Sequence, residues 1–332
     1  MKYDFNKSLK KHKQLYILGL ICIIIIISAA LIIKNNISTK EEYKLASINS
    51  NDELSFAVLG DVHDNISNFE TAIDDIYKIN NNMDALILNG DNVDQGLDYQ
   101  YDEMKEVLDK NKDKLPENII KNIGNHEFYN YDEGTNSKED VQECINKYLD
   151  FSGNEKVYHD NWIKGYHFIS LGTEDQNSDT ADSIQAYISD EQVNWLSEKL
   201  GENYEKGKPI FVFLHQPFLM NFWGKSYSGV DESNSENIIN ILSEYPEVVL
   251  FTSHSHKDLN DENINNDYPF TMVHTGAVGY TIVHDDSSNS LNQEYSYING
   301  LYVQVNGNDV KVNGLDLKDK TVTFSEDISK SE

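Results

Sequence analysis

The residues best suited to chemistry in this chain occur in five short polar clusters, each directly after an apolar run. These clusters are "GDVHDN" (60–65), "GDNVDQG" (90–96), "GNHE" (124–127), "HQP" (215–217) and "SHSH" (253–256). They offer carboxylates, an amide oxygen and imidazoles, but no thiolate. This mixture suits Mn²⁺, Fe or Zn²⁺ better than Ca²⁺, for which an all-oxygen set is expected. The clusters therefore indicate a metal site, provided that the fold brings them together.

Two of the clusters place metal-binding side chains at alternate positions. Asp61 and His63 are two residues apart, and so are His254 and His256. In an extended backbone this spacing points both side chains of a pair to the same face. We therefore expect both members of each pair to face the same rim of the sheet.

The elements that would position these clusters alternate between strands and helices. Predicted strands cover 54–60, 84–90, 119–124, 166–172, 210–215, 248–254 and 271–276. Predicted amphipathic helices cover 69–79, 99–110, 190–200 and 236–245. This alternation is typical of an α/β domain with a largely parallel sheet, in which ligands bind just outside the carboxyl ends of the strands. Residues 297–317 are expected to add antiparallel strands separated by "NG" turns.

The order of the clusters resembles the signature of the calcineurin-like metallophosphoesterase superfamily. That signature reads D-x-H, G-D-x-x-D, G-N-H-[DE], a lone His and finally G-H-x-H, and the resemblance runs from about 56 to 276. The segment "DEQVNWLSEKL" (190–200) is also similar to a helix of the superfamily's small-molecule phosphodiesterases and acid-phosphatase-like members. The resemblance implies a four-layer αββα sandwich with a two-metal site.

The resemblance also implies roles for individual residues. One divalent ion would be held by Asp61, His63, Asp91 and His256. The other would be held by Asp91, Asn125, His215 and His254, with Asp91 bridging the two. His126 would be the catalytic His, and Asp94 its carboxylate partner. The role of Glu127 stays open between support of a ligand and a purely structural role.

The implied chemistry is hydrolysis of a phosphoester. Two metal ions ~3.5–4 Å apart share a water that becomes hydroxide at neutral pH, and the same cations hold the phosphoryl oxygens. A neighbouring His, here His126, can protonate the leaving alkoxide.

Two positions depart from the superfamily pattern. Gln95 stands where the protein Ser/Thr phosphatases have Arg, and the chain contains no Arg at all. This argues against phosphoprotein specificity built on bidentate guanidinium–phosphate contacts. Ser253 stands where Gly is usual, which would strain the backbone by roughly 1 kcal/mol if that position has a positive φ.

Composition limits the kinds of partner that the chain can bind. The chain has 332 residues and a formal net charge of −29; residues 1–33 contribute +4, so the rest carries −33. Such a domain should repel nucleic acid and anionic membrane surfaces. The two cysteines, Cys22 and Cys144, have no metal-binding or CxxC spacing and are not expected to pair.

The N-terminus predicts export. Residues 15–33 form an uninterrupted apolar stretch, long enough to span a membrane as a helix. Lys7, Lys10, Lys11 and Lys13 precede it and are expected to keep the tail cytoplasmic. A cleaved signal peptide ending near "SAA" (28–30) is the alternative, and would give a secreted protein. The expected organisation is a cytoplasmic basic tail, a transmembrane signal-anchor, a linker, the metallophosphoesterase domain and an acidic tail: 1–14, 15–33, 34–53, 54–325 and 326–332.

These observations predict a membrane-anchored extracellular hydrolase. It would be a metal-dependent phosphoesterase acting on a small phosphomonoester or phosphodiester, with two divalent ions per chain, Mn, Fe or Zn. A catalytically silent metal-binding sensor or interaction module at the cell surface is the alternative, and a phosphatase of protein or lipid substrates is a further rival. The loop at 221–229 is either a substrate wall or a plain surface loop.

Overall fold

The computed structural model describes eight stretches of the chain, all within one compact unit that runs from Ile48 to Glu332. These stretches are 52–132, 136–176, 184–218, 220–222, 225–227, 229–231, 234–285 and 290–328. The predicted basic tail and transmembrane segment lie outside them, as do most of the predicted linker and residues 329–332 of the predicted acidic tail. Within the described stretches, no helix has the length and apolar character needed to cross a membrane.

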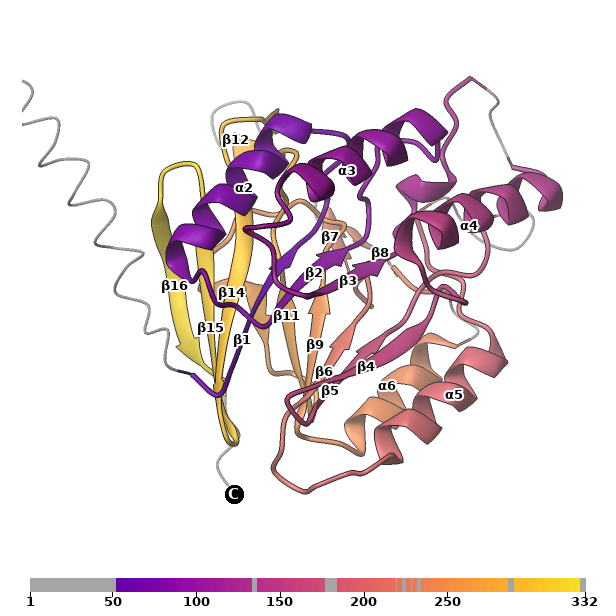
Figure 1. Cartoon of the computed structure of the whole chain (residues 1–332). Coiled ribbons are helices and arrows are strands. Elements are labelled where there is room, and N and C mark those ends of the chain that lie inside the picture. Colours follow the sequence, from indigo (N-terminus) through magenta and orange to yellow (C-terminus); the bar gives the residue numbers. More distant parts are fainter. Residues whose placement is uncertain are drawn as a thin grey trace, which may run out of the picture. The chain divides into compact units, whose positions relative to one another are not determined.

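Two six-stranded sheets form the centre of the unit (Figure 1). The first has the order β16 (Thr321–Asp327), β15 (Asp309–Asp316), β14 (Asn299–Asn306), β1 (Leu54–Leu59), β2 (Ala85–Asn89), β3 (Asn118–Asn122). The second has the order β10 (Ile264–Asn265), β11 (Thr271–His274), β9 (Val248–Thr252), β6 (Ile210–Phe213), β5 (Tyr166–Ser170), β4 (His159–Ile163). Two small ribbons pair β7 (Met220–Phe222) with β8 (Lys225–Tyr227) and β12 (Thr281–Asp285) with β13 (Ser290–Glu294).

Alternating side chains on the strands build two apolar layers. Phe211 and Phe213 of β6 point into the core between the sheets, where the Phe56 ring of β1 lies 4.9 Å from that of Phe211. Ile210 and Val212 point to the other face of the same strand and pack under helices. Because successive strand residues face opposite sides, a continuous apolar run such as "IFVF" fits a strand that is covered on both faces.

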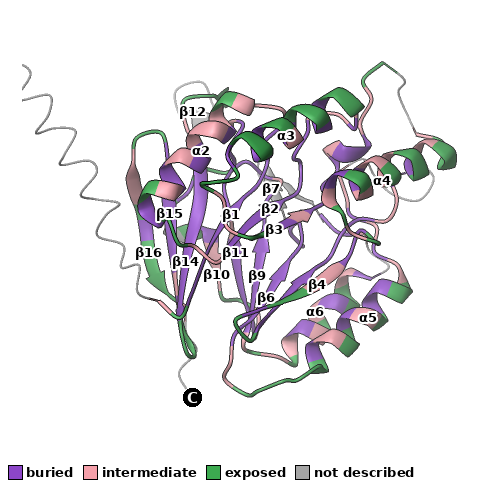
Figure 2. Cartoon of the chain, in the orientation of Figure 1, coloured by how far each residue is buried: buried purple, intermediate pink, exposed green. Residues whose placement is uncertain are grey.

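Helices cover the two outer faces, giving the layer order helix–sheet–sheet–helix (Figure 1). Over the first sheet lie α2 (Ile66–Ile79), α3 (Asp98–Lys110) and α4 (Lys138–Ser152); over the second lie α5 (Asp190–Gly201) and α6 (Ser235–Ser243). Each buries one face and exposes the other (Figure 2). Side-chain caps define several starts: Asn65 accepts from Asn68 N before α2, and Ser137 forms a capping box with Asp140 before α4.

The sheets are mixed, not largely parallel as the alternation of elements predicted. Strands β1, β2 and β3 are parallel, and so are β5, β6, β9 and β11, whereas β14, β15 and β16 pair antiparallel. The antiparallel character of the C-terminal strands is as predicted. Strand β16 continues through Asp327, so the first two residues of the predicted acidic tail belong to the sheet. The parallel strands are the part of the fold that positions the site.

Candidate metal centre

All five polar clusters follow the carboxyl ends of parallel strands. The clusters at 60–65, 90–96 and 124–127 follow β1, β2 and β3 of the first sheet, whereas 215–217 and 253–256 follow β6 and β9 of the second. Because the sheets face each other, groups from both meet at one edge of the sandwich. Ligand-binding residues of open α/β sheets lie in this same place.

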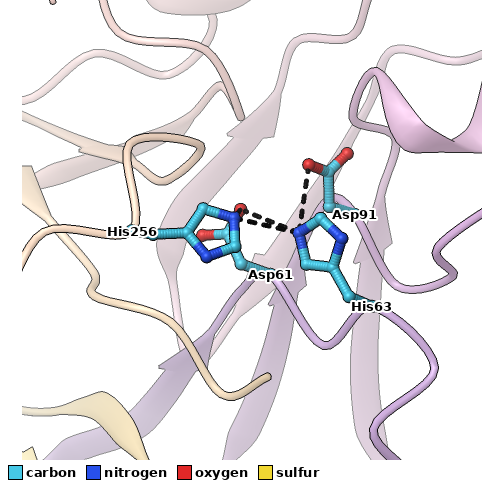
Figure 3. A group of neighbouring side chains, drawn as sticks. All are labelled: Asp61, His63, Asp91 and His256. Atoms are coloured by element: carbon cyan, nitrogen blue, oxygen red, sulfur yellow. Dashed lines mark hydrogen bonds and ion pairs between the residues drawn. The ribbon is translucent and has the colours of Figure 1, made fainter. Parts of the chain in front are cut away.

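A first group consists of Asp61, His63, Asp91 and His256, all of them buried (Figure 3). The Nε2 atom of His63 lies 3.9 Å from Asp61 Oδ1, 3.6 Å from Asp91 Oδ2 and 3.0 Å from His256 Nε2. One potential ligand atom from each residue lies within 4.8 Å of the others. These are the four residues predicted for one ion, and they converge on a single point.

A second group shares Asp91 with the first and adds His215 and His254. Asp91 Oδ2 is 3.0 Å from His215 Nε2. Asn125 lies directly before His126, whose main-chain N–H donates to Asp91 Oδ1 at 2.8 Å. The Asn125 amide donates to the Tyr129 hydroxyl at 2.8 Å, and its Oδ1 is buried without a partner. Three of the four residues of the second predicted set therefore lie together, and Asn125 is connected to them through the main chain of His126.

His126 and Asp94 lie beside these groups and are more accessible to solvent. Their side chains are 17% and 35% exposed, whereas that of His63 is 3% exposed. The Nδ1 atom of His126 lies 2.9 Å from the main-chain oxygen of Asp94 and 3.6 Å from its carboxylate. Asp94 does contact His126, as predicted, but the short hydrogen bond is made by its main-chain carbonyl. Since that oxygen can only accept, Nδ1 must carry a proton.

Unpartnered atoms show that divalent ions fit this site. The Nδ1 atom of His254 and the Oδ1 atom of Asn125 are buried and lack hydrogen-bond partners, and the buried Nε2 atom of His215 faces only the carboxylates of Asp91 (3.0 Å) and Asp61 (3.8 Å). A buried polar atom without a partner costs about 1–3 kcal/mol, so groups of them in a native fold require an explanation. Bound cations would satisfy all three.

Main-chain carbonyls orient two of these rings. His215 Nδ1 lies 2.8 Å from Asn89 O, and His256 Nδ1 lies 2.8 Å from Tyr280 O. In the neutral form of each ring the proton is therefore on Nδ1, and Nε2 carries the lone pair that is directed to the centre. Metal-binding histidines are commonly held in this way.

Electrostatics favour the same interpretation. Burial lowers the pKa of His254 to about 3 and that of His256 to about 4, so both imidazoles are neutral at neutral pH, as a metal ligand must be. Burial opposes ionisation of Asp91, but His215 and His126 outweigh it and hold the pKa of the carboxyl well below its usual range. The other two histidines behave differently: although burial opposes it, neighbouring carboxylates raise the pKa of His215 to about 9 and that of His63 to about 10. In the absence of an ion these two rings therefore balance the buried carboxylates, a charge that bound cations would supply instead.

The backbone at the clusters is left-handed, not extended as the alternate spacing suggested. The residues with positive φ here are Asp61 (53°), His63 (48°), Asp64 (58°), Asp91 (50°), His254 (73°) and His256 (53°). Such backbone costs of order 1–3 kcal/mol per residue and is concentrated at functional sites. Hydrogen bonds hold it in place: the His254 N–H, for example, donates to both Asp61 carboxylate oxygens at 3.1 Å. The paired side chains converge through sharp turns.

Glu127 has a structural role that the sequence left open. Its buried carboxylate accepts hydrogen bonds from the main-chain N–H groups of Asp91 (3.1 Å), Asn92 (2.8 Å) and Gly124 (2.7 Å). The pKa of Glu127 is raised, by burial and by the nearby Asp91. Glu127 therefore ties the loop that carries Asp91 to the loop that carries Asn125 and His126.

Ser253 does not strain the backbone, because it is absent from the residues with positive φ. Its hydroxyl accepts from Asn89 Nδ2 at 2.9 Å and lies 2.7 Å from Thr275 Oγ1. A side chain at Gly60 would collide with this hydroxyl, at 2.5 Å. The serine fills space that Gly60 leaves free.

Four tyrosines near the centre were missed by sequence reasoning. Tyr129 and Tyr131 follow "GNHE" within the aromatic run "FYNY", which was a usable signal. Tyr280 and Tyr295 lie far from any cluster in the sequence, and no spacing pointed to them.

In the loop at 221–229, the side chains through residue 228 lie outside what the structure describes.

Comparison with known proteins identifies the family but not the activity in detail. A family model described as calcineurin-like phosphoesterase matches residues 54–258. A search of curated protein sequences gave no significant match.

Solved structures with a similar fold include a dimetal phosphatase from Danio rerio (TM-score 0.56, 12% identity, covering 85% of this chain and 100% of that one). They also include purple acid phosphatase PPD1 from yellow lupin seeds (TM-score 0.57, 14% identity, 83% of this chain and 53% of that one). A third is GAP50, the anchor in the inner membrane complex of Plasmodium (TM-score 0.53, 14% identity, 84% and 89%). This chain spans about half the length of the lupin enzyme. At such low identities these likenesses show the fold alone.

The family match covers more than half of the chain and includes all five clusters. The chain belongs to the calcineurin-like phosphoesterases, and is a metal-dependent phosphoester hydrolase with a binuclear metal site.

Proposed function

We propose that this protein hydrolyses a small phosphomonoester or phosphodiester outside the cell, while anchored to the membrane by its N-terminal segment. The observation that carries the catalytic part is the set of buried ligand atoms beside the more exposed His126: those of His254 and Asn125 have no partner, and that of His215 faces the Asp91 carboxylate. Buried side chains that can bind cations thus lie beside an imidazole, that of His126, which a substrate can reach and which can donate a proton.

The proposed ligands are those expected from the sequence. Asp61, His63, Asp91 and His256 would hold one ion, and Asp91, Asn125, His215 and His254 the other. Two bound divalent ions would supply positive charge to the phosphoryl oxygens and lower the pKa of the attacking water. The left-handed turns and Glu127 keep the ligand atoms in position before any ion arrives.

His126 is the proposed proton donor to the leaving alkoxide. Its Nδ1–H is engaged by the Asp94 carbonyl, so Nε2 is the atom that can gain and release a proton. The Asp94 carboxylate, 3.6 Å from Nδ1, stabilises the charged ring when Nε2 is protonated. Donation from Nε2 would contribute the typical 10²–10⁴-fold of general acid catalysis.

A small substrate is favoured over protein or nucleic acid. The chain contains no Arg that could make bidentate contacts to the phosphate of a phosphoprotein. The net charge of −33 on residues 34–332 repels polyanions. The alternative, a catalytically silent metal-binding module, requires loss of the bridging Asp or the catalytic His. Asp91 and His126 are both present, which favours catalysis.

The extracellular location rests on the N-terminal sequence. The apolar stretch at 15–33 and the Lys-rich tail before it favour a single-pass anchor with the catalytic domain outside. Protease added to intact cells should then release the domain and leave the anchor in the membrane. Protection of the domain until the cells are lysed would exclude this topology.

The activity is tested with the soluble domain on a panel of phosphomonoesters and phosphodiesters, each with Mn²⁺, Fe²⁺, Zn²⁺ or Mg²⁺. Hydrolysis of small esters that depends on added metal is expected. The Asp91→Asn variant measured in parallel controls for contaminating phosphatases. Metal binding without turnover of any ester would favour the silent module.

A further inference from the structure

Aromatic rings form a continuous row across the metal centre and extend to the surface on both sides. In order, this row consists of Tyr131, Tyr129, His126, His63, His256, Tyr280 and Tyr295. The central rings belong to the candidate metal and catalytic residues, whereas the outer tyrosines have no role in the chemistry proposed so far.

One arm of the row starts at the catalytic His126. Its ring centroid lies 4.2 Å from that of His63 and 4.3 Å from that of Tyr129. The Tyr131 ring follows at 6.1 Å from Tyr129 and is 60% exposed. The Tyr131 hydroxyl lies 3.3 Å from Asp94 Oδ1, which keeps this exposed ring beside the site.

The other arm starts at His256, whose ring lies 4.7 Å from that of His63. Tyr280 stacks on His256 at 4.1 Å with an interplanar angle of 26°. The Tyr295 ring lies 5.6 Å from Tyr280 and is 58% exposed. Two ring-to-ring steps therefore separate a metal-centre histidine from an exposed tyrosine on each arm.

The exposure of the two end rings is unusual within the described stretches. Only five large hydrophobic side chains are more than about a third exposed there: Tyr99, Tyr131, Trp162, Tyr204 and Tyr295. Two of these five end the aromatic row. Exposed aromatic surface that continues into a catalytic centre is typical of a binding site, because a planar ligand can cover it.

The surrounding charge restricts the ligand further. The Asp94 carboxylate beside Tyr131 would repel a second phosphate at this arm, so the group bound there is uncharged or positively charged. Tyrosine rings offer a π face without positive charge, which suits stacking on a flat ring and not capture of an anion.

We propose that the exposed tyrosines of this row bind a planar aromatic ring in the non-phosphate part of the substrate. The inference rests on the proposed function and narrows it to small phosphoesters that carry such a ring. A nucleoside ester and a simple aryl ester share this chemistry. They differ in whether a sugar separates the ring from the phosphate.

The test compares esters that differ only in the ring. Adenosine 5′-monophosphate and ribose 5-phosphate have the same kind of primary-alcohol leaving group, and their methyl diesters form a second pair for a diesterase. The wild type is expected to favour the adenosine compound in kcat/KM by roughly 5- to 100-fold, the range for stacking of one base. Phenyl phosphate tests simple aryl esters. If its hydrolysis depends on the tyrosines and that of the nucleotide does not, the ring that they bind belongs to an aryl ester.

Variants assign the preference to the row. In the Tyr131→Ala/Tyr295→Ala double variant, kcat/KM should fall for the ring-bearing ester alone, so that the preference for this ester is lost. The Tyr131→Phe/Tyr295→Phe variant should keep the preference. Tyr204→Ala is the matched control. Tyr204 is also exposed but bonds to Glu247, just before β9, at the opposite end of the strands from the site.

Two results would overturn the inference while leaving the hydrolase intact. One is equal kcat/KM for both esters of each pair together with phenyl phosphate hydrolysis that the double Ala variant leaves unchanged; the other is an equal loss on all esters in that variant. If no ester is hydrolysed, the proposed function fails, and titration with adenosine and with ribose still decides the role of the row. Binding of adenosine that is lost in the double Ala variant supports it. Failure of the wild type to bind adenosine more tightly than ribose refutes it.

Discussion

Asp91 belongs to both candidate ligand groups, so one substitution at this position affects both ions. We expect Asp91→Asn to abolish activity and to lower the number of metal ions per chain, as measured by elemental analysis of the purified domain. Asp98→Asn is the control, because that side chain is 80% exposed and lies outside both ligand groups. Two ions per chain with near-normal turnover in Asp91→Asn would rule out the bridging role.

His126 differs from the ligands because it should matter for turnover and not for metal content. His126→Ala is expected to lower kcat by roughly 10²–10⁴ while both ions stay bound. The loss should shrink for esters with good leaving groups, such as 4-nitrophenyl esters, which need no protonation. A loss of the same size across all leaving groups would remove the acid role.

At the scale of elements, Ser253 connects the end of β9 to the first sheet through Asn89 and to β11 through Thr275. Replacing it by the Gly usual in the family should therefore destabilise the fold instead of relieving strain. We expect Ser253→Gly to lower the free energy of unfolding by about 1–3 kcal/mol in a denaturant titration. Ser253→Ala separates the lost hydrogen bonds from the added backbone freedom. An increase in stability with either variant would contradict this view.

The strands that carry the clusters were predictable, whereas several neighbouring elements were not. Apolar runs that end in polar residues identified β1, β2, β6 and β9. Helix α4 (138–152) was missed because "KEDVQECINKYLDFS" is mostly polar, and β4 because only the last residue of "HDNWI" is buried. Both elements depend on packing against neighbours, which local patterns do not record.

Of the three "NG" pairs near the C-terminus, only one forms a turn. Gly307 has φ +60° in the two-residue loop between β14 and β15. Gly300 and Gly314 lie inside those strands, where a Cβ would collide with the side chains of Leu59 and Phe324, respectively. These two glycines are required for close packing between distant segments, a reason that is not visible in the dipeptide itself.

At the scale of the molecule, the net charge sets the response to salt. Beyond residue 33 the chain carries −33, and it should repel anionic substrates at long range. The Debye length falls from ~30 Å at 0.01 M to ~10 Å at 0.1 M salt. We expect kcat/KM for a small anionic phosphoester to rise over this range, with long nucleic acids remaining poor substrates. A steep fall in kcat/KM with salt would refute the charge argument.

The division of the strands between two sheets was implied by the family resemblance, and the two six-stranded sheets agree with it, but the pattern of elements alone did not contain it. The clusters indicated that the strand ends converge, but a single sheet would also satisfy that condition. Strand order depends on pairing between residues far apart, such as Leu54 with Val305. The candidate site was thus more predictable than the architecture around it, because its residues carry distinctive chemistry.

Since the ligands come from both sheets, bound ions would also cross-link the two sheets and stabilise their packing. Asp61, His63 and Asp91 follow strands of the first sheet, and His215, His254 and His256 follow strands of the second. A ligand present at 100 times its Kd stabilises a fold by about 2.7 kcal/mol, so chelation should lower Tm, and His256→Ala should reduce that difference. An unchanged Tm after complete metal removal would refute this cross-linking role. If the domain lies outside the cell, as we propose, persistence of the folded enzyme would then depend on the supply of metal in its surroundings.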